Sequence, residues 1–121
     1  MKNIEQKIKK YLESRGWINA LPGDMAKSIS IESAELLEHF QWRNPTPDEL
    51  KKDKEKLEDI KKELADVLIY CIDLSIILGL NTEKIILDKL KYNEKKFPAK
   101  KVKGNSKNYY EIKKNYRKKG F

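Results

Sequence analysis

Two pairs of acidic residues, each pair spaced by three positions, are the part of this sequence best suited to chemistry. The first pair is Glu32 and Glu35, and the second is Glu63 and Asp66. Side chains three positions apart lie on the same side of an α-helix, so each pair would offer two carboxylates from one helix face. Carboxylates that lie close together repel one another unless a cation balances their charge. Magnesium takes oxygen ligands and binds phosphate groups, so the pairs predict a site for such a divalent cation.

Each acidic pair is embedded in the apolar stripe of its helix. With about 100° between successive residues, the first pair falls between apolar groups that contain Leu36 and Ile31, and the second between groups that contain Val67 and Ile77. Acids that contact only solvent would lie on the helix face opposite the apolar stripe. If the two helices pack antiparallel, the stripes bring the four carboxylates together in a partly dry place. The alternative is that the acids pair with lysines across the bundle.

Glycine and proline residues divide the chain into long segments rich in Leu, Ile, Lys and Glu, which favours helices over strands. The four expected helices cover about residues 2–15, 24–43, 48–78 and 82–97. The expected N-terminal caps are Asp24 for the second helix, Thr46 or Asp48 for the third, and Asn81 or Thr82 for the fourth. Gly79 suits the left-handed residue that ends the third helix. Residues 108–114 would form one short helix or none.

The composition favours a single domain in a reducing compartment. The 121 residues are 38% charged and 39% hydrophobic, and the apolar residues are concentrated in residues 60–80. Three acids within that run argue against a membrane span. Cys71 is the single cysteine and has no partner for an internal disulfide, which fits a reducing cytosol. We therefore expect a cytoplasmic protein.

The formal charge of +8 belongs to the C-terminal end. Residues 100–121 contain nine Lys or Arg residues and one acid, so residues 1–99 are formally neutral. We expect a helical domain over residues 1–104 and a basic, partly disordered tail over residues 105–121. Basic segments with aromatic residues can bind nucleic acid, which leaves a nucleic-acid-binding module as an alternative function. Its contact surface would comprise Tyr109, Tyr110, Tyr116 and Phe121. A lysine-rich terminus is more often a solubilising end, so nucleic acid is not the favoured partner.

The third expected helix is apolar on nearly every side over residues 64–78. A helix of that kind has to be buried on every side, and one chain of this length cannot easily enclose it. An exposed apolar surface of that extent indicates an interface. Closed symmetric assemblies are the usual solution, so we expect a homo-oligomer with a two-fold dimer as the minimum.

Three stretches carry a resemblance to a known family. They are residues 28–42 (SISIESAELLEHFQW), 63–70 (ELADVLIY) and 89–98 (KLKYNEKKFP), in that order. The chain resembles the MazG-like all-α nucleoside triphosphate pyrophosphatases, in particular the dCTP pyrophosphatase branch, over about residues 10–112. The resemblance implies an all-α fold, a four-helix bundle assembled as a tetramer from two dimers, with each active site completed by a neighbouring chain.

The same resemblance implies a reaction, namely hydrolysis of a nucleoside triphosphate such as dCTP to the monophosphate and pyrophosphate, a housekeeping task for the nucleotide pool. Mg²⁺ would be bound by Glu32, Glu35, Glu63 and Asp66, and either Glu35 or Glu38 would orient the attacking water. The substrate would contact six further side chains: Trp17, Trp42, Tyr70, Lys89, Asn93 and Lys96.

The six substrate contacts have separate roles and separate alternatives. The two tryptophans match positions that shape the base pocket, and Lys89, Asn93 and Lys96 match positions on the phosphate side. The alternative for Trp42 and Tyr70 is packing in the core, and the lysines lie in a helix that is rich in lysine in any case.

One departure from the family pattern lies before the second helix. The family often has His-x-Pro-x-Asn there, with the histidine near the nucleotide, whereas this chain has Ala20 near the histidine position and Asp24 in place of the asparagine. The resemblance therefore implies the reaction but does not indicate which base the nucleotide substrate carries.

Overall fold

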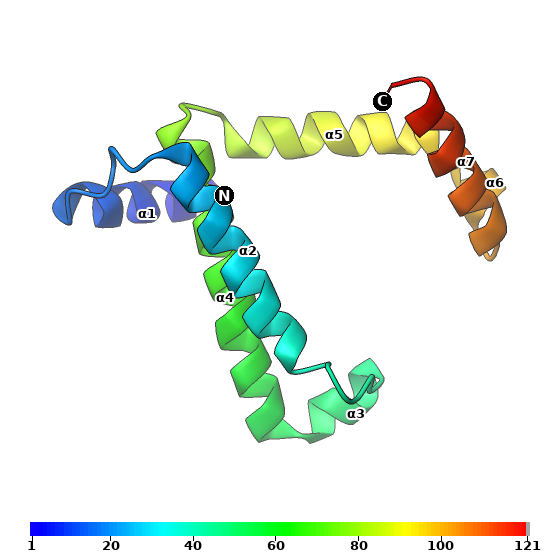
Figure 1. The fold of residues 1–121 in the computed structure, drawn as a ribbon, viewed down its shortest axis with the longest axis horizontal. Helices are drawn as coiled ribbons and strands as arrows, with labels where there is room; N and C mark the ends of the chain where they lie inside the picture. The colour runs from blue at the N-terminus through cyan, green and yellow to red at the C-terminus, as the bar shows by residue number, and fades with distance from the viewer. Residues whose placement is uncertain (121) are drawn as a thin grey trace. The chain divides into compact units, whose positions relative to one another are not determined.

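The computed structural model describes residues 1–120, and every regular element in that range is a helix (Figure 1). The seven helices are α1 (Lys2–Ser14), α2 (Pro22–Glu38), α3 (Pro47–Lys52), α4 (Lys54–Ile77), α5 (Thr82–Lys96), α6 (Ala99–Val102) and α7 (Ser106–Lys118). They fall into two compact units, one from Met1 to Thr82 and one that begins at Glu83. The expected all-α class is confirmed.

The first unit is organised around the pairing of α2 with α4. The two helices lie side by side and run in opposite directions (Figure 1). Helices α1 and α3 also pack against α4. Helix α4 is therefore the central element of this unit, and its phase about its own axis decides which side chains meet α2.

Helices α3 and α4 replace the single helix expected over residues 48–78, and the break falls at Asp53. This residue has φ −95° and ψ 83°, outside the helical region, and its carboxylate accepts a hydrogen bond of 3.1 Å from the backbone N–H of Lys56. Asp53 therefore ends one helix and caps the next. The expected cap at Thr46 is confirmed, because its hydroxyl and Glu49 form a capping box at the start of α3.

Helix α2 begins and ends earlier than the sequence pattern suggests. Leu21 occupies the N-cap position and Pro22 the first helical position, so the expected cap at Asp24 is wrong. Asp24 lies instead in the first turn, within 3.7 Å of the Lys27 ammonium. The helix ends at Glu38 rather than at residue 43, which leaves Trp42 outside it.

A tight turn follows α4. Gly79 has φ 67°, a left-handed conformation that costs glycine little, so the expected helix end at this residue is confirmed. The Leu80 N–H donates to the Ser75 carbonyl at 2.9 Å. The turn brings the hydroxyl oxygens of Ser75 and Thr82 within 2.6 Å of each other, and both side chains are buried. This hydrogen bond closes the turn within the first unit.

Few apolar side chains are enclosed by the chain itself. Within residues 1–120, Leu12 and Ile72 are the buried ones. The large apolar side chains that stay exposed on α4 and α5 are Leu64, Leu68, Ile69, Ile85, Ile86, Leu87 and Leu90. No helix in the described part of the chain is long and apolar enough to cross a bilayer.

The second unit folds the basic C-terminal end onto aromatic side chains. Helix α7 has thirteen residues, more than the short helix considered at residues 108–114, and the Asn105 side chain caps it by accepting from the Asn108 N–H at 3.0 Å. The rings of Phe97 and Tyr109 stack with centroids 4.7 Å apart. The expectation of a partly disordered tail is therefore wrong for residues 105–120.

Candidate functional site

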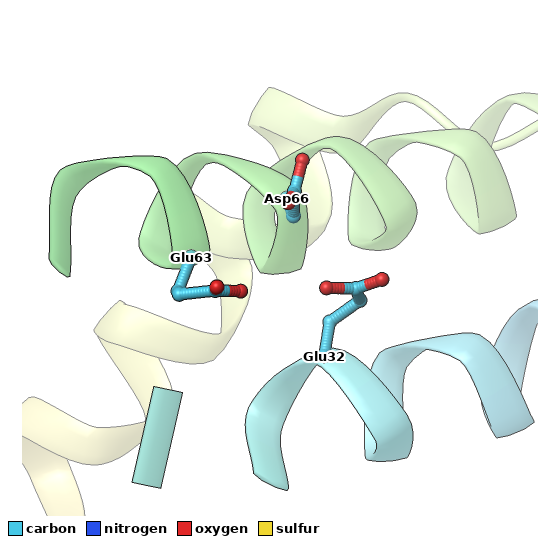
Figure 2. A group of neighbouring side chains, drawn as sticks. All are labelled: Glu32, Glu63 and Asp66. Atoms are coloured by element: carbon cyan, nitrogen blue, oxygen red, sulfur yellow. The ribbon is translucent and has the colours of Figure 1, made fainter. Parts of the chain in front are cut away.

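Three of the predicted carboxylates converge between α2 and α4. Glu32 projects from α2, and Glu63 and Asp66 project from α4; one oxygen of each lies within 4.8 Å of the others. Figure 2 shows the Glu32 carboxylate in the space between the helices, facing the two acids of α4. The antiparallel packing of the two apolar stripes produces this cluster, because each stripe carries its acids toward the other helix, with Asp66 at the exposed edge.

Glu35, the fourth acid, lies beside this group. It lies close enough to Glu32 and Glu63 to raise the pKa of both, through hydrogen bonding and through its charge. The four acids therefore form one group, in which protons or a cation must offset the negative charge.

The surroundings of the cluster disfavour its ionised form. Burial raises the pKa of Glu32, and the hydrogen bond with Glu35 and the charges of the other acids raise it further. The pKa of Glu63 is raised in the same way, by burial first and then by Glu35, whereas the charge of His39 lowers it. One oxygen of each of these two glutamates is buried without a hydrogen-bond partner.

Basic side chains do not neutralise the cluster. In residues 1–120 the ion pairs within 4 Å join Asp24 to Lys27, Glu58 to Lys61 and Asp88 to Lys84, all on the surface. The alternative in which the four acids pair with lysines across the bundle is therefore not what the chain does. The donor set, four carboxylates with two buried unpartnered oxygens, fits a hard divalent cation.

A cavity of about 700 Å³ adjoins the cluster in the first unit, and Asp66 belongs to both. Its lining combines apolar, aromatic and polar side chains: Lys7, Ile8, Tyr11, Leu12, Trp17, Ala20, Asp24, Met25, Ser28, Asp66, Ile69, Tyr70 and Asp73. Its volume lies in the range of small-molecule sites. A ligand in this cavity would therefore reach the carboxylates at one end.

Two of the predicted substrate contacts, Trp17 and Tyr70, line this cavity. The Trp17 ring is half exposed and meets Tyr11 edge to face, with centroids 5.9 Å apart. Burial raises the pKa of the Tyr70 hydroxyl, and the negative charges of Glu32, Asp73 and Asp66 add to the shift. Tyr70 thus stays protonated near the cluster and keeps a hydrogen-bond donor there.

The remaining predicted site residues lie elsewhere. Glu38 is exposed at the end of α2 and lines a second cavity with Trp42, whose side chain is 87% exposed. Trp42 is therefore not a core residue of this chain. Lys89, Asn93 and Lys96 lie on α5 in the second unit, where the Lys96 ammonium sits over the Tyr116 ring at 4.9 Å.

The surface required by the nucleic-acid alternative is largely occupied within the second unit. Tyr109 stacks on Phe97, and Tyr116 meets Tyr92 edge to face at 6.0 Å. Tyr110 is 68% exposed, and Phe121 lies outside the described residues. Rings that pack against their own unit are not available to stack on bases, so this geometry does not favour the alternative.

Comparison with known proteins places the chain in a family. Residues 27–112 match the MazG-like family. The chain belongs to the MazG-like family. This confirms the family suggested by the sequence motifs, which lie within the matched residues except for the segment around Trp17.

Two relatives of this MazG-like chain carry functional names. Human dCTP pyrophosphatase 1 is 27% identical over 92 residues, which are 75% of this chain and 54% of that protein. The chain thus spans about half the length of its curated relative. The crystal structure of a pyrophosphatase from Archaeoglobus fulgidus is 35% identical, with a TM-score of 0.70, and the match covers 81% of this chain and 92% of that one.

Asp73 was not among the residues that the sequence singled out for the site of this MazG-like chain. It is buried, 4% exposed, and lies in the wall of the cavity. A signal was available, because Asp73 follows Asp66 by seven residues and Tyr70 by three, which puts all three on one face of α4. An acid within an apolar stripe was thus present a third time on the same helix.

Proposed function

We propose that this protein hydrolyses a nucleoside triphosphate to the monophosphate and pyrophosphate, with Mg²⁺ bound by Glu32, Glu35, Glu63 and Asp66. The observation that carries the proposal is the cluster itself: acids from two helices meet, and buried oxygens of Glu32 and Glu63 have no hydrogen-bond partner. Membership of the MazG-like family and the pyrophosphatase names of both relatives support the same reaction. When bound, magnesium would offset the negative charge that the acids and the triphosphate share.

We propose that Glu35 orients the attacking water and accepts its proton. Glu35 raises the pKa of both Glu32 and Glu63, which places its carboxyl group beside the cluster. A carboxylate in that place can orient a water molecule and accept its proton while the water oxygen forms a bond to the α-phosphorus. The bond from the α-phosphorus to the bridging oxygen then breaks, and pyrophosphate leaves. Glu38 is exposed in a different cavity, which makes it the weaker choice.

A deoxynucleotide such as dCTP is our proposed substrate. The name of the human relative supports it, and the cavity beside the cluster offers the aromatic ring of Trp17 for stacking on a base. Trp42 on the base side, and Lys89, Asn93 and Lys96 on the phosphate side, complete the proposed contacts. A nucleotide-pool role in the cytoplasm follows from such a substrate, and the free Cys71 fits that compartment.

A homo-oligomer, a tetramer or otherwise a dimer, is part of the proposal. Leu64 and Leu68 of α4 are exposed in the single chain, and so are Ile85 and Leu90 of α5. Apolar side chains repeated along two helices form surfaces that associate in water. A second copy of the chain is the partner that would cover them symmetrically.

The products of the reaction test the proposal directly. The protein would be incubated with dCTP, with Mg²⁺ or with EDTA, and the products separated by ion-exchange chromatography. We expect dCMP and pyrophosphate only with the metal; dCDP and phosphate as main products would rule out this reaction. Glu35→Ala and Asp66→Ala should each abolish product formation with the helical content unchanged. Asp59→Asn, which removes an exposed acid from the same helix, is the matched control and should stay active.

A further inference from the structure

The cavity beside the acid cluster holds a carboxyl group that the proposed reaction does not use. Asp73 is 4% exposed, and its Oδ1 atom is buried without a hydrogen-bond partner. Leaving a buried acceptor unpaired costs a folded protein free energy, so such a group calls for an explanation in function. Lys7, Tyr11 and Tyr70 share the cavity wall, yet none of them donates to this atom.

The position of Asp73 relative to the cluster suits the far end of a nucleotide. Asp66 and Asp73 are seven residues apart on one face of α4, which corresponds to about 10 Å along the helix axis. A nucleoside spans a comparable distance from its 5′-phosphate to the outer edge of its base. With phosphates at the cluster and the ring between Trp17 and Tyr70, the outer edge of the base would reach Asp73.

We propose that Asp73 recognises the exocyclic amino group of the substrate base, so that the cavity selects amino-bearing bases over their oxo counterparts. The amino group would donate to the carboxyl oxygen that lacks a partner. A base with a carbonyl oxygen in the same place would set two acceptors against each other. This inference rests on the proposed function, and it names the base class that the site would accept.

The bases differ in the group that they would present to Asp73 Oδ1. Cytosine presents its 4-amino donor and adenine its 6-amino donor, whereas uracil and hypoxanthine carry a carbonyl oxygen in the same place. Because Oδ1 is a buried acceptor without a partner, it matches the amino group and not the carbonyl oxygen.

Paired nucleotides that differ only in this group test the proposal. We would measure kcat/KM for dCTP against dUTP, and for dATP against dITP, with wild type, Asp73→Asn and the surface control Asp59→Asn. Wild type and control should prefer the amino member of at least one pair by about a hundredfold, because a site that hydrogen-bonds an N–H rejects analogues without it. Asp73→Asn should bring that ratio to within about threefold, because a rotated amide can donate to a carbonyl.

The outcomes separate the two proposals. An active wild type with equal rates on both members of each pair, or an Asp73→Asn variant that keeps the wild-type ratio, overturns the role of Asp73 and leaves the proposed function intact. No pyrophosphate from any of the four nucleotides overturns both. If Asp73→Asn fails to fold, the wild-type protein is tested with the 2-pyrimidinone deoxynucleotide triphosphate, which lacks the amino group and adds no bulk. A rate equal to that for dCTP overturns the proposal. A loss of about tenfold or more supports it.

Discussion

Glu32 on α2 faces Glu63 on α4, and each keeps one carboxylate oxygen buried without a hydrogen-bond partner. Both pKa values are raised above the ordinary 4.5. Between 4.5 and the raised values, the folded chain therefore binds more protons than the unfolded chain. The free energy of unfolding of the metal-free protein falls as the pH rises through that window, and the whole loss is present above it.

Magnesium should accordingly stabilise the protein more at pH 7.5 than at pH 4.5. Metal binding requires ionised carboxylates and offsets their repulsion, so its effect grows as the cluster deprotonates. Thermal melts with Mg²⁺ or EDTA at the two pH values measure this, and we expect a rise of a few degrees at pH 7.5 and almost none at pH 4.5. Equal shifts at both pH values would contradict a site formed by these acids.

Glu63→Gln should stabilise the metal-free protein and inactivate it. The substitution removes one of the mutually repelling charges, so the melting temperature in EDTA at pH 7.5 should rise by a few degrees. The same substitution removes a metal ligand, so pyrophosphate release should disappear. Asp59→Asn serves as the control and should change neither quantity. A lower melting temperature for Glu63→Gln would mean that the glutamate is stabilising without a cation.

Glu35 and Glu38 should differ sharply in their effect on turnover. Glu35→Gln removes a carboxylate held at the cluster and should lower kcat by about a hundredfold or more, the usual scale for a general base. Glu38→Gln changes an exposed residue in another cavity and should stay within about threefold of wild type. Steady-state rates of pyrophosphate release compare the two variants. The reverse order would transfer the role to Glu38.

The Ser75–Thr82 hydrogen bond should contribute measurably to stability. The two hydroxyl oxygens are 2.6 Å apart, and Thr82 is only 6% exposed. Ser75→Ala and Thr82→Val should each lower the free energy of unfolding by about 1–3 kcal/mol, because each leaves a buried hydroxyl unpaired. The double variant should cost less than the sum, since no unpaired group remains. Urea titrations supply the four values, and strict additivity would argue against a direct bond.

Leu68→Asp should weaken assembly without unfolding the chain. Leu68 is 53% exposed on α4 and does not line the cavity beside the acid cluster, so a charge there faces water in the single chain and apolar surface in an oligomer. Light scattering at micromolar concentration should give a smaller mass than for wild type. Ile72→Asp is a contrasting variant, because Ile72 is buried within the chain and its replacement should prevent folding. An active wild-type monomer of 14.3 kDa would contradict the assembly.

Periodicity and spacing were sufficient for the two helices that carry the acids and for most of the acid cluster. Apolar stripes predicted α2 and α4, and the three-residue spacing placed Glu32, Glu63 and Asp66 on facing sides. The break at Asp53 was not predictable from periodicity, because residues 51–56 are all charged and carry no apolar stripe that a break would interrupt. The break depends on a local competition, in which the Asp53 side chain caps a new helix instead of the backbone continuing the first one.

The other differences have separate causes. Trp42 lies outside α2 because the helix ends at Glu38, and an angular plot assumes that the helix continues. Asp24 lost the cap position to Leu21, since Pro22 is already suited to the first helical position. Helix α7 forms on a charged sequence because Tyr109 and Tyr116 gain ring contacts. No single stretch of sequence contains that information.

Helix α4 carries Glu63 and Asp66 of the cluster, Tyr70 and Asp73 of the cavity, and the Ser75 hydroxyl that is hydrogen-bonded to Thr82. All of these depend on one rotational register. A single inserted or deleted residue between Glu63 and Asp73 would turn everything after it by about 100°. The carboxylates, the cavity wall and the turn would then separate at once. Substitutions on this helix change one contact at a time, whereas its length between Glu63 and Asp73 is fixed. Natural variation in chain length should therefore be confined to the loops before Pro22 and around residues 39–46.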